Sequence, residues 1–289
     1  MKKKMLLAIS ALTTSTTLLA GCGIRFGIES RENKRNIIDS FIDNVTNNDF
    51  DSNPNNSSSA IYNEDLHQSI STENVTKIDI SILASEVTIK AIGGNEVTLD
   101  CTGSSNIVKE TTYNKNNNTI YIQEKGSKSY NYTGINNSVS RKVIIGIPSS
   151  FEGDAIISCG AGEIIINDAI FKALDIKGGA GELTLSNIVF ENLSLEQGIG
   201  ETSINLNKKC GDMYISGGMG EFTLNLSEVG GNLTYSGGIG EATIDLPENA
   251  PVKLLTKAGL GETNISATTS GENTYTFDLS VGIGSLTVK

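Results

Sequence analysis

A glutamate recurs along the chain at a nearly constant spacing, each time directly after a Gly-x-Gly phrase. The step between the second glycines of successive phrases is 19 to 23 residues, and the last phrase ends in Ser285 instead of glutamate. A row of carboxylates could hold a hard cation such as calcium, which prefers oxygen ligands. The corner residues defined in this way are Gly162, Glu163, Gly181, Glu182, Gly200, Glu201, Gly220, Glu221, Gly240, Glu241, Gly261 and Glu262, with Glu86 as an earlier member of the glutamate row.

The calcium-binding nonapeptide repeat differs from this phrase in one decisive position. That repeat places an aspartate two residues after the last glycine of Gly-Gly-x-Gly-x-Asp. In this chain the same position holds Leu183, Phe222 or Ala242 in different repeats. The glutamates are therefore expected to be solvated structural corners, with no metal site and no cofactor.

Groups that could perform catalysis are scarce in this sequence. The chain has one histidine, His67, and no tryptophan. A glycosidase needs differentiated carboxylates in a cleft, and a polysaccharide lyase needs a base or a cation there, whereas these glutamates form a uniform row. We expect a non-catalytic protein that presents a surface for interaction. The alternative is a protein that binds or acts on cell-wall glycan, for which Tyr214 is predicted to point outward and Tyr235 into the core.

The N-terminal residues have the pattern of an export signal. Three lysines precede an apolar, Thr-rich stretch, and Leu19-Ala20-Gly21-Cys22 resembles the bacterial lipobox. That resemblance implies removal of residues 1–21, lipidation of Cys22, and attachment to the extracytoplasmic face of the cell membrane. Loss of the three lysines changes the formal net charge from −11 to −14, which disfavours nucleic acid as a partner.

Residues 22–76 have the composition of a linker. Residues 30–45 carry apolar side chains at helical spacing and could form a short helix, with Ser30 as its N-cap. Residues 47–59 are rich in Asn and Ser, which is typical of a flexible spacer.

From residue 77 to residue 289, alternating apolar and polar residues flank each Gly-x-Gly phrase, a pattern that predicts half-buried strands. Ala180 and Leu183 would both point inward, yet they are an odd number of positions apart. The inside-outside phase must therefore slip once, at Gly181-Glu182, where the chain turns a corner. The residues expected to be buried are Leu174, Ile176, Leu183, Leu185, Leu193, Leu195, Ile204, Ile215, Leu224, Leu233, Ile244 and Ile265.

Repeats of about 20 residues that cannot bury their own apolar face are stabilised by stacking on their neighbours. The sequence thus predicts an all-β fold, a β-solenoid in which one repeat is one rung. The alternative is a sandwich of stacked antiparallel hairpins, which shares the pattern and differs in strand direction. We expect the residue between the two glycines to fill the corner from inside. Residues 275–289 are expected to be the last rung, with an uncovered end at which a second copy could pair.

Two segments rich in Asn, Lys, Ser and Tyr, residues 109–118 and 126–140, are predicted as the longest loops and as candidate contact sites for an envelope protein. Three cysteines remain after Cys22, namely Cys101, Cys159 and Cys210. Their odd number leaves at least one free thiol. Cys159, which precedes a corner, is expected to be buried.

Taken together, the strand–Gly-x-Gly-Glu–strand phrase over residues 78–289 resembles a bacterial β-strand-repeat family of candidate adhesins of the toast-rack type. The strand Val143-Ile144-Ile145-Gly146-Ile147-Pro148 is similar to the one that precedes the regular repeats in that family. The resemblance implies a stacked β-fold and a role in adhesion or in sensing envelope stress. It implies no catalytic residues.

Overall fold

The structure is a computed structural model that describes residues 63–104, 108, 111–124 and 141–289. The expected signal peptide, Cys22, the helix expected over residues 30–45 and the segment 126–140 lie outside the described residues. Within these described ranges, no helix has the length and apolar character needed to cross a bilayer.

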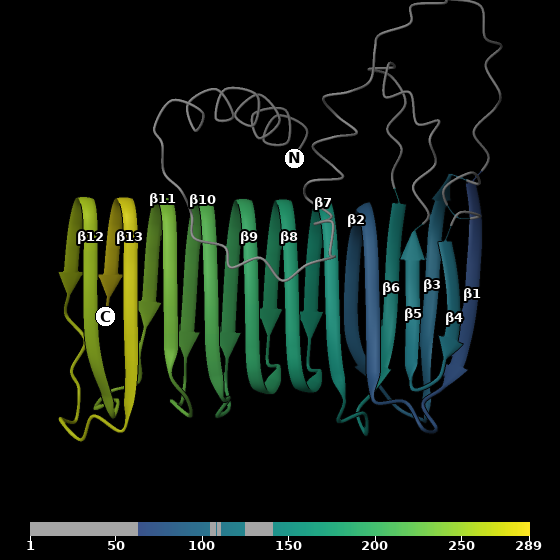
Figure 1. Ribbon diagram of the computed structural model, residues 1–289, viewed down its shortest axis with the longest axis horizontal. Helices are drawn as coiled ribbons and strands as arrows, with labels where there is room; N and C mark the ends of the chain where they lie inside the picture. Colours follow the sequence, from purple (N-terminus) through teal and green to yellow (C-terminus); the bar gives the residue numbers. More distant parts are fainter. Residues whose placement is uncertain (1–62, 105–107, 109–110, 125–140) are drawn as a thin grey trace, which may run out of the picture. The chain divides into compact units, whose positions relative to one another are not determined.

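The described residues form one 13-stranded sheet, so the all-β prediction is confirmed. The strands lie side by side in the order β1-β3-β6-β2-β7-β8-β9-β10-β11-β13-β12, with the hairpin β4-β5 attached to β2 (Figure 1). The first six are β1 (Asn63–Ser71), β2 (Lys77–Ile92), β3 (Glu96–Ser104), β4 (Thr111–Asn116), β5 (Thr119–Glu124) and β6 (Arg141–Pro148).

Two segments of this N-terminal part differ from the expectation. β1 pairs antiparallel with β3, so the sheet already begins within the segment expected to be a linker, and His67 lies on a strand. Residues 111–116, expected in a loop, form β4 and pair antiparallel with β5. Tyr113 is the one aromatic residue of the polar strand β4, and its hydroxyl donates to the Val97 carbonyl oxygen at 2.5 Å. This contact helps to bind the hairpin to the sheet.

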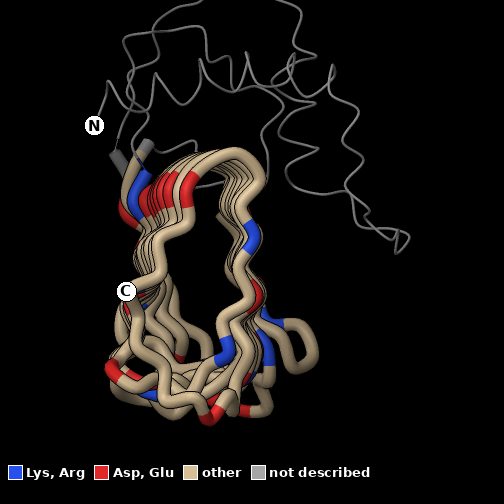
Figure 2. The backbone as a smooth tube through the Cα atoms, turned by 90° about the vertical axis from the view of Figure 1, so that its left-hand side faces the viewer, with Lys and Arg blue, Asp and Glu red and all other residues tan. Residues whose placement is uncertain are grey.

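The repeat region consists of long strands that pair in parallel. They are β7 (Asp154–Asn167), β8 (Ile170–Ser186), β9 (Val189–Leu206), β10 (Asp212–Leu226), β11 (Leu233–Asp245), β12 (Val252–Ile265) and β13 (Tyr275–Val288). This direction is the one that stacked rungs require, and it excludes antiparallel hairpins for these repeats. Figure 2, which looks along the stack of strands, shows the long strands bending over in an arch.

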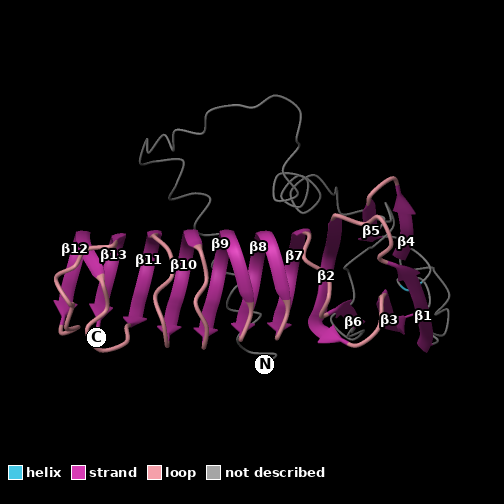
Figure 3. Ribbon diagram, turned by 90° about the horizontal axis from the view of Figure 1, so that it is seen from below, coloured by secondary structure: helices cyan, strands magenta, loops and turns pink. Residues whose placement is uncertain are grey.

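Each arch has a first leg before its Gly-x-Gly phrase and a second leg after it. Apolar side chains of both legs point into the space between them and form one core. Figure 3 shows from below how the loops connect one strand to the next. Of the twelve residues predicted to be buried, eleven are, and the twelfth, Ile265 on β12, is 46% exposed.

The exception follows from an unexpected strand order at the C-terminal end. β13 lies between β11 and β12, so β12 and not the last repeat is the edge strand. The prediction that residues 275–289 form the uncovered rung is therefore wrong. At core positions where β13 has Leu279 and Leu286, its neighbour β12 has Thr256 and Thr263. Because an inner rung is covered on both sides, the more apolar repeat is better placed there.

This order predicts unequal effects of two leucine substitutions. Leu279→Ala on β13 removes a side chain that is 0% exposed, and it should lower the free energy of unfolding by about 2–5 kcal/mol. Leu260→Ala on β12 removes one that is 71% exposed, and it should cost about 0.5 kcal/mol or less. Urea denaturation of dilute protein measures both. A larger loss for Leu260→Ala would contradict the burial of β13 and the exposure of β12.

Candidate functional site

The glycine corners of neighbouring strands lie directly beside one another. Gly162 pairs with Gly181, and Gly181 pairs with Gly200. On the C-terminal side Gly220 pairs with Gly240, and Gly240 pairs with Gly284. The phase slip inferred from the sequence thus occurs at the same height in each rung, and the stack of slips forms the bend of the arch.

The second glycine of each phrase has a backbone conformation that other residues rarely adopt. Its φ is positive in all seven phrases, from 129° at Gly162 to 149° at Gly261, a range that strongly favours glycine. A Cβ added to Gly220 would also lie 1.8 Å from the carbonyl oxygen of Gly200 on the neighbouring strand. Both the local conformation and the neighbouring backbone exclude a side chain.

The first glycine is required for a different reason. Gly218 has no positive φ, but a Cβ there would lie 2.1 Å from the carbonyl oxygen of Gly198. The constraint at this position is the close approach of two backbones. A repeat therefore needs two glycines because each faces a different obstacle to a side chain.

A row of carboxylates follows the bend on its outer side, visible as a red band in Figure 2. Glu86, Glu163, Glu182 and Glu201 are paired in register on adjacent strands, and Glu221 pairs with Glu241. The glutamates of the row are exposed, apart from the half-buried Glu163. Two carboxylates about 4.8 Å apart in water repel each other by about 0.9 kcal/mol, which a solvated surface tolerates.

Both ends of this acidic row are modified. Lys142 on β6 pairs with Glu86, so a positive charge lies next to the first carboxylate. Ser285 on β13 lies between Glu241 and Glu262 and separates their charges. Among the described residues, no group of three or more His, Cys, Asp or Glu side chains is arranged to hold a metal ion. The row thus forms a continuous negative surface rather than a discrete site.

At the C-terminal end of the sheet, the side chains between the two glycines do not fill the corner as expected. Ile239 is 50% exposed, Ile283 on the adjacent strand is 47% exposed, and Leu260 beyond it is 71% exposed. In these three strands the middle side chain of the phrase lies on the bend and not in the core, whereas Ala161, Ala180, Ile199 and Met219 in the earlier repeats are half-buried. An apolar strip therefore runs beside the acidic row at the C-terminal end.

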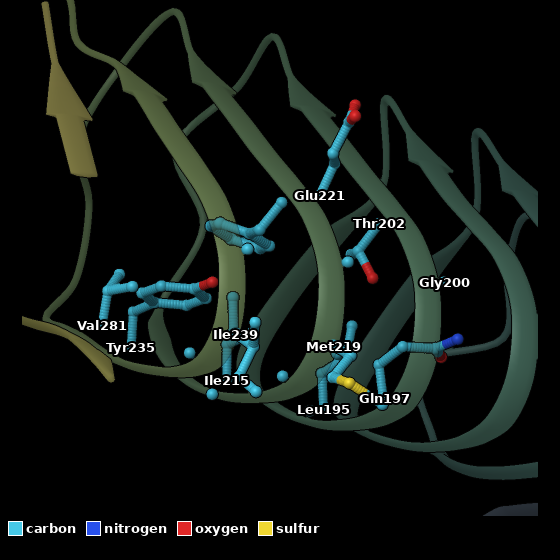
Figure 4. Close-up of a pocket in the computed structure, with 17 residues that line it drawn as sticks. Leu195, Gln197, Gly200, Thr202, Ile215, Met219, Glu221, Tyr235, Ile239 and Val281 are labelled. Atoms are coloured by element: carbon cyan, nitrogen blue, oxygen red, sulfur yellow. The ribbon is translucent and has the colours of Figure 1, made fainter. Parts of the chain in front are cut away.

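A small pocket lies beneath the bend between β9 and β11 (Figure 4). Leu195, Gln197, Met219 and Tyr235 line it, and its volume of about 20 Å³ has room for about one water molecule. The Gln197 amide nitrogen donates to the Gly181 carbonyl oxygen at 3.2 Å. This pocket is too small for a sugar or a nucleotide, so we assign it to packing.

The two tyrosines occupy the positions predicted from the alternation. Tyr235 is buried and stacks on Phe222 with ring centroids 4.3 Å apart, and burial raises the pKa of its hydroxyl to about 12. Tyr214 is 57% exposed on the outer face of the first legs. There it borders a shallow pocket of about 260 Å³ with Asp175, Asn192 and Ser194.

A buried ion pair was missed by the sequence reasoning. The guanidinium Nη1 of Arg141 lies 2.7 Å from Glu124 Oε2, and both side chains are almost fully buried. The same guanidinium donates from Nη2 to Thr111 Oγ1 at 2.5 Å, and Glu124 Oε2 accepts from the Leu83 amide at 2.8 Å. Arg141 is the only arginine after residue 35. A single arginine in a domain whose other cations are lysines was the sequence feature that could have pointed to a buried ion pair.

This ion pair joins β5 to β6 at the bend. β5 pairs with the first leg of β2 and β6 pairs with its second leg. The rung beside β2 is therefore built from two strands, and residues 125–140 connect them where other rungs have a Gly-x-Gly phrase.

The three cysteines beyond Cys22 are buried and unpaired. Burial raises the pKa of the Cys159 thiol to about 11 and also raises that of Cys210. These thiols therefore remain protonated at neutral pH, which is unfavourable for a nucleophile or a metal ligand. The prediction that Cys159 is buried is confirmed.

A sheet of parallel, arched strands with glycines stacked at the bend defines a strand-repeat domain of the toast-rack type. Residues 75–201 match the Toastrack DUF4097 family. No curated protein matches the chain.

Crystal structures of several bacterial proteins are similar to this chain. One is a candidate cell adhesion protein from Clostridium sporogenes, 16% identical, with a TM-score of 0.42 over 79% of this chain and 99% of that chain. Another is a candidate adhesin from Bacteroides fragilis, 17% identical, with a TM-score of 0.44 over 78% of this chain and 97% of that chain.

The corner geometry predicts that two glycines on β10 respond differently to substitution. Gly220→Ala combines a positive φ with backbone overlap, and it should reduce the free energy of unfolding by at least about 2 kcal/mol. Gly217→Ala is the control, because its added Cβ has no neighbour closer than 3.8 Å. We expect a change of about 0.5 kcal/mol for the control. Equal unfolding midpoints in urea would contradict the assigned role of the corner.

Proposed function

We propose that this protein is a lipid-anchored, non-catalytic interaction module on the extracytoplasmic face of the cell membrane, with a role in adhesion or in sensing envelope stress. Its domain is a β-solenoid in which each rung of about 20 residues turns at a Gly-x-Gly-Glu corner. The observation that carries the proposal is the acidic row, which repeats one carboxylate on adjacent strands from Glu86 to Glu241.

Identical groups in a row favour binding over catalysis. A reaction needs an acid, a base or a nucleophile that differs in environment from its neighbours. The glutamates of the row occupy equivalent places on adjacent strands, and all but the half-buried Glu163 are exposed, so the row does not offer the differentiated groups that a reaction needs. A repeated surface is instead suited to an extended partner, because each rung adds one more equivalent contact. The partner proposed here is another envelope protein.

Attachment to the membrane is the first testable part of this proposal. Cys22→Ala should leave the precursor unprocessed or release the protein into the medium, because the thiol that would carry the lipid is absent. Cell fractionation followed by immunoblotting measures the location and the size of the product. Membrane association and processing that match the wild type would refute lipid anchoring at Cys22.

The interaction surface is tested by charge reversal. Changing Glu182, Glu201 and Glu221 together to Lys should abolish recovery of a defined protein partner from envelope extract, because the negative surface is inverted. The control reverses three exposed glutamates outside the row, Glu191, Glu228 and Glu248, and should recover the partner as the wild type does. Loss of the partner from both variants, or from neither, would contradict binding through the acidic row.

The alternative function, recognition of cell-wall glycan, is favoured by one observation. The pocket of about 260 Å³ beside Tyr214 combines an exposed aromatic ring with the Asp175 carboxylate, whose buried Oδ1 has no hydrogen-bond partner among the described residues. An aromatic face and a carboxylate can together bind a sugar ring. Saturable glycan binding that is lost in Tyr214→Ala and kept in Thr234→Ala, the paired position on β11, would favour this alternative.

A further inference from the structure

The C-terminal edge of the sheet is open. β12 pairs with β13 on one side, and no described strand covers its other side (Figure 1). Its 14 residues include the exposed apolar side chains of Leu255, Leu260 and Ile265. A long, partly apolar edge of this kind presents unpaired backbone groups to any strand that can pair with it.

We propose that this edge is a dimer interface, in which β12 pairs antiparallel with β12 of a second copy of this chain around a two-fold axis. The inference does not depend on the proposed function. It assigns the occupant of the open end from the arch shape and from the order of residues on β12.

The arch shape makes a two-fold arrangement possible. Consider a two-fold axis that lies in the plane of the arch and runs through the bend, midway between the two legs. Rotation by 180° about this axis places the first leg where the second leg was and reverses the direction of the chain. A second copy placed by this rotation covers the open end with its own β12, first leg on second leg and bend on bend. The resulting strand pair is antiparallel and the assembly is closed, as expected for an isologous interface.

One pairing register of β12 with β12 of the second copy gives favourable neighbours on both the core-facing and the solvent-facing side of the strand. With Lys257 opposite Glu262 of the second copy, Thr256 lies opposite Thr263, Leu255 opposite Asn264, and Leu254 opposite Ile265. β12 is in register with β13, so Leu254, Thr256, Thr263 and Ile265 are core-facing positions. The inside-outside alternation reverses once at Gly261. Because of this reversal, each core-facing residue of the first leg lies opposite a core-facing residue of the second copy's second leg.

The chemistry of the opposed pairs is also complementary. Leu254 meets Ile265, two threonines meet each other, and the exposed Lys257 meets the exposed Glu262. Apolar pairs, Thr–Thr pairs and opposite charges are all favourable cross-strand neighbours. The two-fold axis repeats each pair, so two lysine–glutamate contacts form. Shifting the register by two residues places Lys257 opposite Leu260 or Asn264 and loses both contacts.

The competing arrangement is head-to-tail. β1 is the opposite edge of the sheet, and pairing β12 of one copy with β1 of the next would generate an open filament. In that arrangement Lys257 and Glu262 of two β12 strands do not meet, so the favourable pairs of the two-fold arrangement are lost. The size distribution in solution therefore separates the two arrangements.

Charge reversal at the interface tests the proposal. In sedimentation equilibrium of the full chain in detergent, we expect a monomer–dimer equilibrium that Lys257→Glu weakens at least about tenfold, since it creates two repulsive contacts. The double variant K257E/E262K should restore dimerisation because the reversed pair attracts again. Lys253→Glu, on the same face but opposite Ser266, is the control and should dimerise like the wild type.

Disulfide cross-linking tests the register. A chain with Leu255→Cys and a differently tagged chain with Asn264→Cys should form a mixed covalent dimer on oxidation, whereas neither should cross-link to itself. Cys101, Cys159 and Cys210 are buried and do not compete, and Cys22 is replaced by Ser in both chains. A monomer at all concentrations, a dimer insensitive to Lys257→Glu, a series of larger species, or self-linking of Leu255→Cys would each overturn the proposal.

Discussion

The close approach of neighbouring backbones at the bend is the constraint on which the rest of this structure depends. The carbonyl oxygen of Gly162 occupies the space that a Cβ of Gly181 would need, and the same relation holds between Gly181 and Gly200. A side chain fits at neither Gly181 nor Gly200, so the bend favours the register in which glycine lies beside glycine and thereby fixes the legs on both sides. That register stacks apolar side chains on apolar side chains inside the arch, and it aligns the glutamates outside.

Much of the fold could be predicted from the sequence because it combines two periods: the two-residue alternation of apolar and polar side chains, and the repeat of the Gly-x-Gly phrase about every 20 residues. Alternation identified the inward residues, and the odd spacing between Ala180 and Leu183 located the corner. The order of the last two rungs could not be obtained from the repeated phrase, which is nearly the same in both. The two repeats differ at core positions, where β12 has Thr256 and Thr263 and β13 has leucines. Less apolar surface is left exposed when β12 is the edge strand. The exposure of Ile239 was also missed, because alternation does not say on which residue of the corner the phase reverses.

The candidate site could be predicted only in part. The acidic row follows from the repeat, since a residue at a fixed place in each rung must recur on one side of a stack. The pair of Arg141 and Glu124 breaks the repeat and could not be found from periodicity. Its two charges are separated in sequence by residues 125–140 and meet only because β5 and β6 flank the same strand. Buried ion pairs tolerate the loss of one partner poorly, so this contact holds the two strands of the split rung together.

The most direct test of the stack is the distance between labelled positions along the acidic row. Spin labels at Glu241 and Ser285 occupy adjacent strands, whereas labels at Glu241 and Glu262 are separated by β13. With a strand spacing of about 4.8 Å, the backbone separation should be about 5 Å for the first pair and about 10 Å for the second. Electron paramagnetic resonance should therefore show the stronger dipolar broadening for the first pair. Stronger broadening for Glu241 and Glu262 would contradict the strand order, and weak broadening for both pairs would contradict the in-register stack.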